Sequence, residues 1–495
     1  MTESVWRIAK DEAVGERGMV VARDPRGARV GLEVLRRGGN AVDAAVTMAF
    51  ALGVVEPMRS GIGGGGMMVI HETARGRTTV IDYAMDAPLA VGPDSFELED
   101  AIGASSYGWQ KVRDEANVAG HRAASIPGAV RGLALALERF GTISLAAALE
   151  PAIRFAEDGV EVSPALALSV ATSMPILSRF PATTAVLLPR GFPLRYDGPG
   201  PGDRLVQRDL GQTLRRVATE GPDVFYEGEI ARRIAGHIQE HGGLIAETDL
   251  ARYRPAIVDG GQETTYRGYR IVGVPGACGS ITVQQGLNIL EGFDLPSLGA
   301  GTVERLHLEA EAFRRAFSDR YRFAGDPKQD SVPWRGLLSK QYAAARRAEI
   351  DPTLSAAEVC PGDPHRFDDA AQPVSLATAA TAPLGGSTTH LSVVDENRNV
   401  VSLTQSLVDG FGCGVTVPGT GVLLNNAMSW FDPEPGRINS AAPGKRGLNN
   451  MSPLVVLRDG QPVLAVGAAG GRKIIHALAQ IVSNVIDHGM GVQDA

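Results

Sequence analysis

A threonine that follows two glycines and a serine is the residue of this sequence best suited to covalent chemistry. It is Thr388, in the stretch GGSTTH at residues 385–390, and the β-branched and apolar residues after it predict a strand. We interpret the bond between Ser387 and Thr388 as a self-cleavage site. Cleavage would give Thr388 a free α-amine beside its hydroxyl, so that one residue would supply both nucleophile and general base. An α-amine titrates at about pH 7.7–8.0, which suits that task near neutrality.

Catalysis by such a threonine needs a group that orients its hydroxyl and N–H donors that stabilise an oxyanion. Thr404 and Ser406, on or just after the expected partner strand, are candidates for the first role. Gly470 and Gly471 lie where a strand should turn into a helix, and N–H groups at a helix start suit the second role. On residue types alone, ordinary structural roles remain the simpler explanation, since hydroxyl residues are frequent on strands and glycine pairs are common in turns.

Other motifs of cofactor or metal chemistry are incomplete. The glycines at 61–66 lead into a strand, whereas a dinucleotide fingerprint leads into a helix. Residues 467–473 lack the spacing of a P-loop, and residues 385–389 lack the last glycine of a G-x-S-x-G elbow. His307 has no second histidine at zincin spacing, and three scattered cysteines make no cysteine zinc site. The sequence therefore predicts neither a cofactor nor a metal ion.

Composition is that of an ordinary soluble globular protein and argues against nucleic-acid and membrane partners. The 495 residues are 44% hydrophobic and 21% charged, with a net charge of −8 and no basic stripe. No apolar run is long enough to cross a bilayer, and the first eleven residues contain no apolar signal segment. We expect a cytoplasmic protein without nucleic-acid or membrane partners.

The elements that must position Thr388 are strands near both ends of the chain with helices between them. The pattern predicts a buried helix at 41–53, strands at 67–70 and 78–83, and helices through the middle of the chain. Residues 351–387 have no such periodicity and are expected to form a long loop leading to Thr388. Strands should resume after it, with a final helix at about 472–487. This arrangement indicates one interleaved α+β unit, in which 387/388 is a processing boundary and not a domain boundary. The remaining predicted elements are helices at 129–139, 143–157, 227–240 and 302–323, and strands near 269–274 and at 388–395, 399–405, 453–458 and 462–467.

Several motifs in order through nearly the whole chain resemble the γ-glutamyltranspeptidase family of N-terminal-nucleophile hydrolases. The strongest are TTH at 388–390, PGTG at 418–421 with LNN at 424–426, and MSP at 451–453. The others are GGNAVDAA at 38–45, SGIGGG at 60–65, IPG at 126–128, FYEG at 225–228, LNILEGF at 287–293 and AFSDR at 316–320.

The resemblance implies a four-layer αββα sandwich made as an inactive proenzyme. Autocleavage before Thr388 would give a large subunit, 1–387, and a small subunit, 388–495, which would associate as a heterodimer and possibly as a dimer of heterodimers. Thr388 would be the acylated nucleophile, with Ser406 hydrogen-bonded to it and Gly470 and Gly471 as the oxyanion hole. The family hydrolyses γ-glutamyl amides such as glutathione, or transfers the acyl group to an amino acid.

The positions that would recognise glutamate depart from the family pattern. Ala84 replaces an arginine for the α-carboxylate, Trp430 an aspartate for the α-amine, and Val408 an asparagine. A serine pair near the α-carboxylate becomes Asn449-Asn450. Loss of a bidentate arginine and of a paired ammonium site should weaken glutamate binding. Trp430 and Val408 suggest an apolar acyl pocket, although ordinary core packing explains them equally well.

We therefore expect a self-processing amidohydrolase or acylase of small-molecule amides with non-glutamyl specificity, similar to the cephalosporin-acylase-like branch. A true γ-glutamyl hydrolase or transferase acting on glutathione, a natural-product hydrolase that cleaves an oxamate-like amide or a carbon–carbon bond, and a non-catalytic scaffold remain alternatives. Family members usually continue beyond residues 486–490 through further strands, so a C-terminal piece of the sandwich is expected to be missing or reorganised.

Overall fold

The computed structural model of this chain describes residues 10–99, 109–197, 201–368 and 386–495. Most of the predicted loop before Thr388, residues 369–385, lies outside the described residues. Before it, residues 364–367 form a short 3-10 helix rather than irregular loop. Among the described residues, no helix is both long and apolar enough to cross a membrane.

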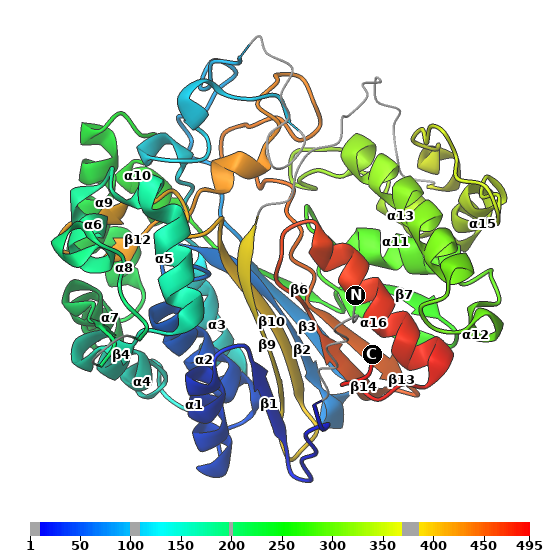
Figure 1. The fold of residues 1–495 in the computed structure, drawn as a ribbon, viewed down its shortest axis with the longest axis horizontal. Helices are drawn as coiled ribbons and strands as arrows, with labels where there is room; N and C mark the ends of the chain where they lie inside the picture. Colours follow the sequence, from blue (N-terminus) through cyan, green and yellow to red (C-terminus); the bar gives the residue numbers. More distant parts are fainter. Residues whose placement is uncertain (1–9, 100–108, 198–200, 369–385) are drawn as a thin grey trace, which may run out of the picture.

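A six-stranded antiparallel sheet brings together strands from before and after residue 387 (Figure 1). Two of its inner strands are β9 (Ser387–Val394) and β10 (Val400–Val408), which pair with each other. On one side β9 pairs with β1 (Met19–Ala22), and on the other β10 pairs with β2 (Gly65–Glu72). The sheet continues through β3 (Arg77–Tyr83) to β6 (Ala256–Asp259). The strands that follow residue 387 thus lie between strands that precede it.

A second, four-stranded antiparallel sheet covers one face of the first. Its order is β14 (Gln461–Val466), β13 (Leu454–Arg458), β8 (Tyr269–Gly273) and β7 (Gln262–Tyr266). The period-2 alternation of strand residues separates the layers. Met67 and Val69 of β2 pack with Val455 and Leu457 of β13 between the sheets. Met68 of β2 packs instead into the helical layer beyond the six-stranded sheet.

Helices cover the two outer faces, which completes the predicted αββα order. Helix α2 (Ala41–Val55) packs on β9 and β10, while α11 (Ser280–Leu290) and α16 (Lys473–His488) pack on the four-stranded sheet. In Figure 1, α1 to α3 lie to the left of the six-stranded sheet, and α11, α13 and α16 lie on the right side of the molecule together with the four-stranded sheet. The other helices are α1 (Pro25–Arg36), α3 (Ala129–Phe140), α4 (Leu145–Asp158), α5 (Pro164–Leu177), α6 (Pro181–Leu187), α7 (Arg208–Glu220), α8 (Asp223–Glu227), α9 (Glu229–Glu240), α10 (Glu247–Arg252), α12 (Leu295–Leu298), α13 (Val303–Phe323), α14 (Trp334–Leu338) and α15 (Lys340–Ala348); short strands are β4 (Val160–Glu161), β5 (Arg204–Leu205), β11 (Thr416–Val417) and β12 (Val422–Leu423).

Helix α2 shows why these elements form where they do. Asn40 caps its start, since its side chain accepts hydrogen bonds from the Val42 and Asp43 N–H groups, and Asp43 accepts from the Asn40 N–H in return. All fifteen residues are buried, so the single apolar stripe expected from the sequence underestimates the contact. Helix α1 and α4 cover the sides of α2 that face away from the sheet. The expected helix at 227–240 is interrupted at Gly228, which separates α8 from α9.

Candidate active site

Thr388 lies at the second residue of β9 with its side chain buried, 5% exposed. It shares the sheet face of His390 and Ser392, the face that meets the four-stranded sheet. Opposite it, β10 has an irregular register between Gln405 and Val408. A bulge of this kind re-aims side chains at the end of a strand. Here it brings Ser406 beside Thr388.

The Ser406 hydroxyl links the nucleophile candidate to the bond expected to break. Ser406 Oγ donates to the carbonyl oxygen of Ser387 at 2.7 Å and accepts from the N–H of Val408 at 2.8 Å. Thr388 Oγ1 lies 3.3 Å from Ser406 Oγ. A serine hydroxyl has one proton and two lone pairs. Because its proton serves Ser387, the remaining partner must be a donor, and Thr388 therefore donates to Ser406.

Gly386 lies directly against the glycine pair that precedes α16. A Cβ added to Gly386 would come within 2.7 Å of Gly471 Cα, and its φ of +142° also favours glycine. Gly470 and Gly471 have φ values of +137° and +60°. Within the described part of the chain, neither of their N–H groups donates a hydrogen bond to another residue. In the uncleaved chain, Gly386 therefore lies next to the N–H groups of Gly470 and Gly471, which are the predicted oxyanion donors.

The pocket around Thr388 is small, and polar and apolar residues both line it. Its free volume of about 10 Å³ corresponds to one water molecule. Trp430, which ends the 3-10 helix Ala427–Trp430, lines it and also packs into the core between the sheets, as Val408 does. Both residues thus belong to the core and also form part of the pocket wall beside Thr388. The complete lining is Gly386, Thr388, Ser406, Val408, Trp430, Asn450, Met451, Gly471 and Ile474.

Thr404 does not contact Thr388. Its Oγ1 lies 2.9 Å from Nδ1 of His390, whose Nε2 lies 3.0 Å from Ser392 Oγ. Burial lowers the pKa of His390 to about 3, so its ring is neutral. Ser392 in turn donates to the Ala465 carbonyl of β14. This polar chain joins the two sheets beside the nucleophile. His390 is too weak a base to take the Thr388 proton, and both of its ring nitrogens already bond Thr404 and Ser392.

The five positions of altered glutamate recognition divide into two groups. Val408, Trp430 and Asn450 line the pocket, whereas Ala84 and Asn449 do not. Asn449 instead donates to the Ala277 carbonyl and shapes its loop.

Arg320 of α13 holds this loop and was missed by the sequence analysis as a site residue. Its guanidinium donates to the Asn449 carbonyl, to Asn450 Oδ1 at 3.2 Å and to the Cys278 carbonyl at 2.7 Å. Burial lowers its pKa to about 10, which leaves it cationic. Its place in the AFSDR match was the signal that could have identified it.

Ala84 is buried behind the pocket, close to a second arginine. Its N–H donates to Asp82 Oδ1, and Asp82 also pairs with Arg446. Arg446 Nε donates to Asp86 at 2.8 Å. Two carboxylates thus balance the charge of Arg446. This arginine is accordingly a poor substitute for the carboxylate-binding arginine that Ala84 replaces.

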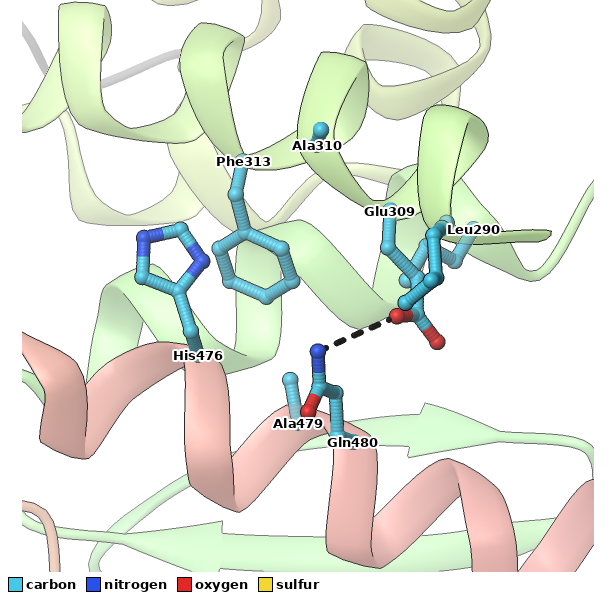
Figure 2. Close-up of a pocket in the computed structure, with 8 residues that line it drawn as sticks. Leu290, Glu309, Ala310, Phe313, His476, Ala479 and Gln480 are labelled. Atoms are coloured by element: carbon cyan, nitrogen blue, oxygen red, sulfur yellow. Dashed lines mark hydrogen bonds between the residues drawn. The ribbon is translucent and has the colours of Figure 1, made fainter. Parts of the chain in front are cut away.

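A more spacious cavity of about 300 Å³ lies between α13 and α16 (Figure 2). In it, the His476 ring packs against Phe313, and Gln480 donates to Glu309 at 3.3 Å. The eight residues that line it include no serine, threonine or cysteine. His476 also lies on the side of α16 opposite Ile474, which reaches the Thr388 pocket. The larger cavity therefore has no nucleophile of its own.

Comparisons with known proteins agree with this geometry. The chain is 41% identical over 492 residues to the acylase ACY 1 proenzyme of Pseudomonas sp. (strain SE83), covering 98% of this chain and 82% of that protein. It is 36% identical to the glutathione hydrolase proenzyme of Bacillus subtilis (strain 168), covering 98% and 80%. The crystal structure of cephalosporin acylase from Bacillus halodurans superposes with a TM-score of 0.85 at 30% identity, covering 99% of this chain and 84% of that one. The gamma-glutamyltranspeptidase family model matches residues 27–495. The chain belongs to the gamma-glutamyltranspeptidase family, and it is an enzyme with the N-terminal-nucleophile hydrolase fold.

Proposed function

We propose that this protein is a self-processing acylase in which Thr388 becomes the N-terminal nucleophile and releases an apolar acyl group from an amide. One observation carries the proposal: Ser406 binds both the Thr388 hydroxyl and the carbonyl oxygen of Ser387. The names of relatives, an acylase proenzyme and a cephalosporin acylase, support the same class of reaction.

Processing would begin with attack of Thr388 Oγ1 on the Ser387 carbonyl carbon. Negative charge would develop on the Ser387 oxygen, to which Ser406 already donates at 2.7 Å. The carbon–nitrogen bond then breaks, and the Thr388 nitrogen takes up the proton that leaves Oγ1. Water hydrolyses the resulting ester, which leaves a carboxylate on Ser387 and frees the hydroxyl and α-amine of Thr388.

The same step would open the substrate site. Gly386 fills the position beside Gly471, and the pocket beside Thr388 now holds no more than one water molecule. Release of the chain end at Ser387 would let Gly386 move away. A substrate carbonyl could then approach Thr388 with its oxygen towards the N–H groups of Gly470 and Gly471.

Turnover would use the new α-amine as the general base. It takes the proton from Thr388 Oγ1, which attacks the amide carbonyl, and the departing amine leaves with that proton. The acyl group stays on Thr388 until water or an acceptor amine attacks the ester. Residues 1–387 and 388–495 would form the two subunits of this enzyme.

Acyl specificity would follow from the pocket wall. Val408, Trp430, Met451 and Ile474 supply apolar surface next to Thr388, and Asn450 supplies the polar side chain there. Among the described residues that line the pocket, none is a cationic side chain that could bind an α-carboxylate or a carboxylate that could bind an α-amine. An apolar acyl chain fits this lining better than glutamate does.

Thr388→Ala and Thr388→Ser variants test the assignment. The unsubstituted protein and the serine variant should each split into chains of 387 and 108 residues. The N-terminal sequence of the 108-residue chain should start at residue 388. Thr388→Ala should stay a single 52.0 kDa chain without hydrolytic activity. Splitting of Thr388→Ala at the same bond would show that the nucleophile is another group. A substrate panel should give faster hydrolysis of amides of apolar acids than of γ-glutamyl-p-nitroanilide, and the reverse order would refute the proposed specificity.

A further inference from the structure

Three histidines from separate parts of the chain meet beside α9, away from Thr388. His237 lies in the last turn of α9, and His241 follows it by one helical turn, so that both lie on the same side. His121 comes from the 3-10 helix His121–Ala123. One ring nitrogen from each lies within 4.8 Å of the other two. Among the described residues, no other set of three or more histidine, cysteine or acidic groups is close enough to hold a metal ion.

Two of these rings face each other through nitrogen atoms. Nε2 of His121 lies 3.2 Å from Nε2 of His237. Zinc binds histidine nitrogen at about 2.0–2.1 Å, and tetrahedral ligands at that distance are about 3.3 Å apart. The observed separation therefore already equals the distance between two ligands of one tetrahedral ion.

The third ring has the tautomer that a metal ligand needs. His241 Nδ1 lies 2.8 Å from the backbone carbonyl of His237, and a carbonyl only accepts, so Nδ1 carries the proton. In the neutral ring, Nε2 of His241 then has a free lone pair. A ligand histidine usually donates its other ring N–H to a carbonyl or carboxylate in this way. His241 stacks on His121 with 4.4 Å between ring centroids, and it is exposed to solvent.

The surroundings keep two of the rings, His121 and His237, neutral. Burial, reinforced by the neighbouring histidines, lowers the pKa of His121 to about 4 and also lowers that of His237. Phe180 packs edge-on against His121 at 5.8 Å. Glu240 is the nearby carboxylate, and it acts on His237 in the opposite direction. These two neutral imidazoles offer lone pairs without competition from protons near neutral pH.

We propose that His121, His237 and His241 form a binding site for one divalent transition-metal ion of the zinc class, with solvent as the fourth ligand. Imidazole nitrogen suits this class, whereas calcium and magnesium require oxygen ligands. The exposed side of His241 leaves room for the solvent ligand. The bound ion fastens the segment at 121–123 to the end of α9. That segment is also tied to the chain beyond β10, because the Gly120 N–H donates to the Cys413 carbonyl. The sequence analysis expected no metal, since only the spacing of His237 and His241 hints at this site.

Isothermal titration with ZnCl2 tests the site on untagged, processed protein that has been treated with EDTA and desalted. The protein should bind one equivalent per 495 residues, and cobalt should give the visible absorption of a tetrahedral ion. His121→Ala, His237→Ala and His241→Ala should each weaken binding by more than the about 10- to 100-fold that loss of an outer partner costs. Zinc should also raise the melting temperature of the unsubstituted protein and not of these variants.

A matched control separates this site from general histidine binding. His307→Gln removes a histidine whose Nε2 bonds the Asp351 carbonyl of another segment, and it should keep the full equivalent of zinc. His237→Gln keeps a similar side-chain volume. It should lose zinc binding in the titration, while its circular dichroism should show that the fold is retained. Absence of stoichiometric zinc in the unsubstituted protein overturns the proposal. Unchanged binding by the His121→Ala/His237→Ala double variant overturns it equally.

Discussion

At the scale of single residues, the hydroxyl of Ser406 contacts both groups that would react at the Ser387–Thr388 bond, the Ser387 carbonyl and the Thr388 hydroxyl. One proton and two lone pairs serve three partners, with the proton on the carbonyl of that bond. The arrangement polarises the carbonyl and directs the Thr388 hydroxyl before any cleavage. We therefore expect Ser406 to act in the processing reaction as well as in turnover.

Replacement of Ser406 should slow the appearance of the two chains. Removal of one oxyanion donor typically lowers the reaction rate by about 10²- to 10³-fold. We expect Ser406→Ala to lower the rate of processing by a similar factor. Ser406→Thr keeps the hydroxyl and should recover much of the rate. Gel electrophoresis at timed intervals after synthesis measures the fraction cleaved.

Ser402→Ala is the matched control for this experiment. Ser402 lies on the same strand and sheet face, but its hydroxyl donates to the Val466 carbonyl of β14 at 3.0 Å. Its loss should lower stability and leave processing at the normal rate. Equal slowing by Ser402→Ala and Ser406→Ala would mean that strand distortion, and not the Ser406 donor, limits the reaction.

The sequence predicted several site residues, but residue types could not predict their contacts. Thr388 and the glycine pair followed from local pattern and from resemblance. Thr404 and Ser406 looked equivalent in the sequence, because both are hydroxyl residues two positions apart on the same face. Only the bulge after Gln405 and the position of His390 assign Ser406 to Thr388 and Thr404 to His390. The contact of Gly386 with Gly471 joins positions 85 residues apart, and no local signal marks it.

At the scale of elements, the end of β10 stores strain where the pocket begins. Val408 has a φ of +87°, in a region that β-branched residues rarely adopt. In that conformation its N–H donates to Ser406 and its side chain lines the pocket. Strained residues of this kind cost about 1–3 kcal/mol and cluster at functional sites. The strained conformation of Val408 thus lowers local stability, and it places the N–H group that bonds Ser406 Oγ.

A pair of asparagine substitutions in β10 can measure this strain. Asparagine tolerates positive φ, so Val408→Asn should relieve strain while it buries an amide. Val400→Asn buries an amide at the other end of the strand, where the φ is not positive. We expect Val408→Asn to be less destabilising than Val400→Asn by about 1–3 kcal/mol, measured by urea unfolding. Equal losses would place the strain elsewhere.

Element boundaries were easier to predict than burial. The predicted strands at 78–83 and 453–458 match β3 and β13 within a residue or two, since alternation and turn residues are local signals. The complete burial of α2 was not predicted, because it depends on α1 and α4 covering the sides away from the sheet. Gly228 interrupts the predicted helix at 227–240 for a local reason, since its ψ of −154° is not helical.

At the scale of the whole molecule, cleavage at 387/388 would not separate the two pieces. Strands β9 and β10 lie between β1 and β2, so the piece from 388 onwards keeps ladder hydrogen bonds on both sides. It also supplies β13, which pairs with β8 in the second sheet. Alternation alone predicts strands with two different faces, but it cannot predict which sheet covers which. The four-layer order came from the resemblance, and the packing between Val69 and Val455 agrees with it.

The polar chain between the two sheets makes stability depend on pH. His390 has an ordinary pKa of 6.5 when unfolded, and burial lowers it to about 3 in the fold. Between these values the unfolded chain binds a proton that the folded chain excludes. The contribution of His390 to stability is therefore complete above pH 6.5 and is lost as the pH falls towards 3, by up to about 1.4 kcal/mol per pH unit.

His390→Gln removes the titrating group. Its deficit in the free energy of unfolding, relative to the unsubstituted protein, should therefore be largest at pH 7.5 and should shrink steadily to pH 4.5. Urea midpoints at each pH measure the difference. A deficit that is the same at every pH would show that the ring at position 390 takes up a proton within the folded sandwich.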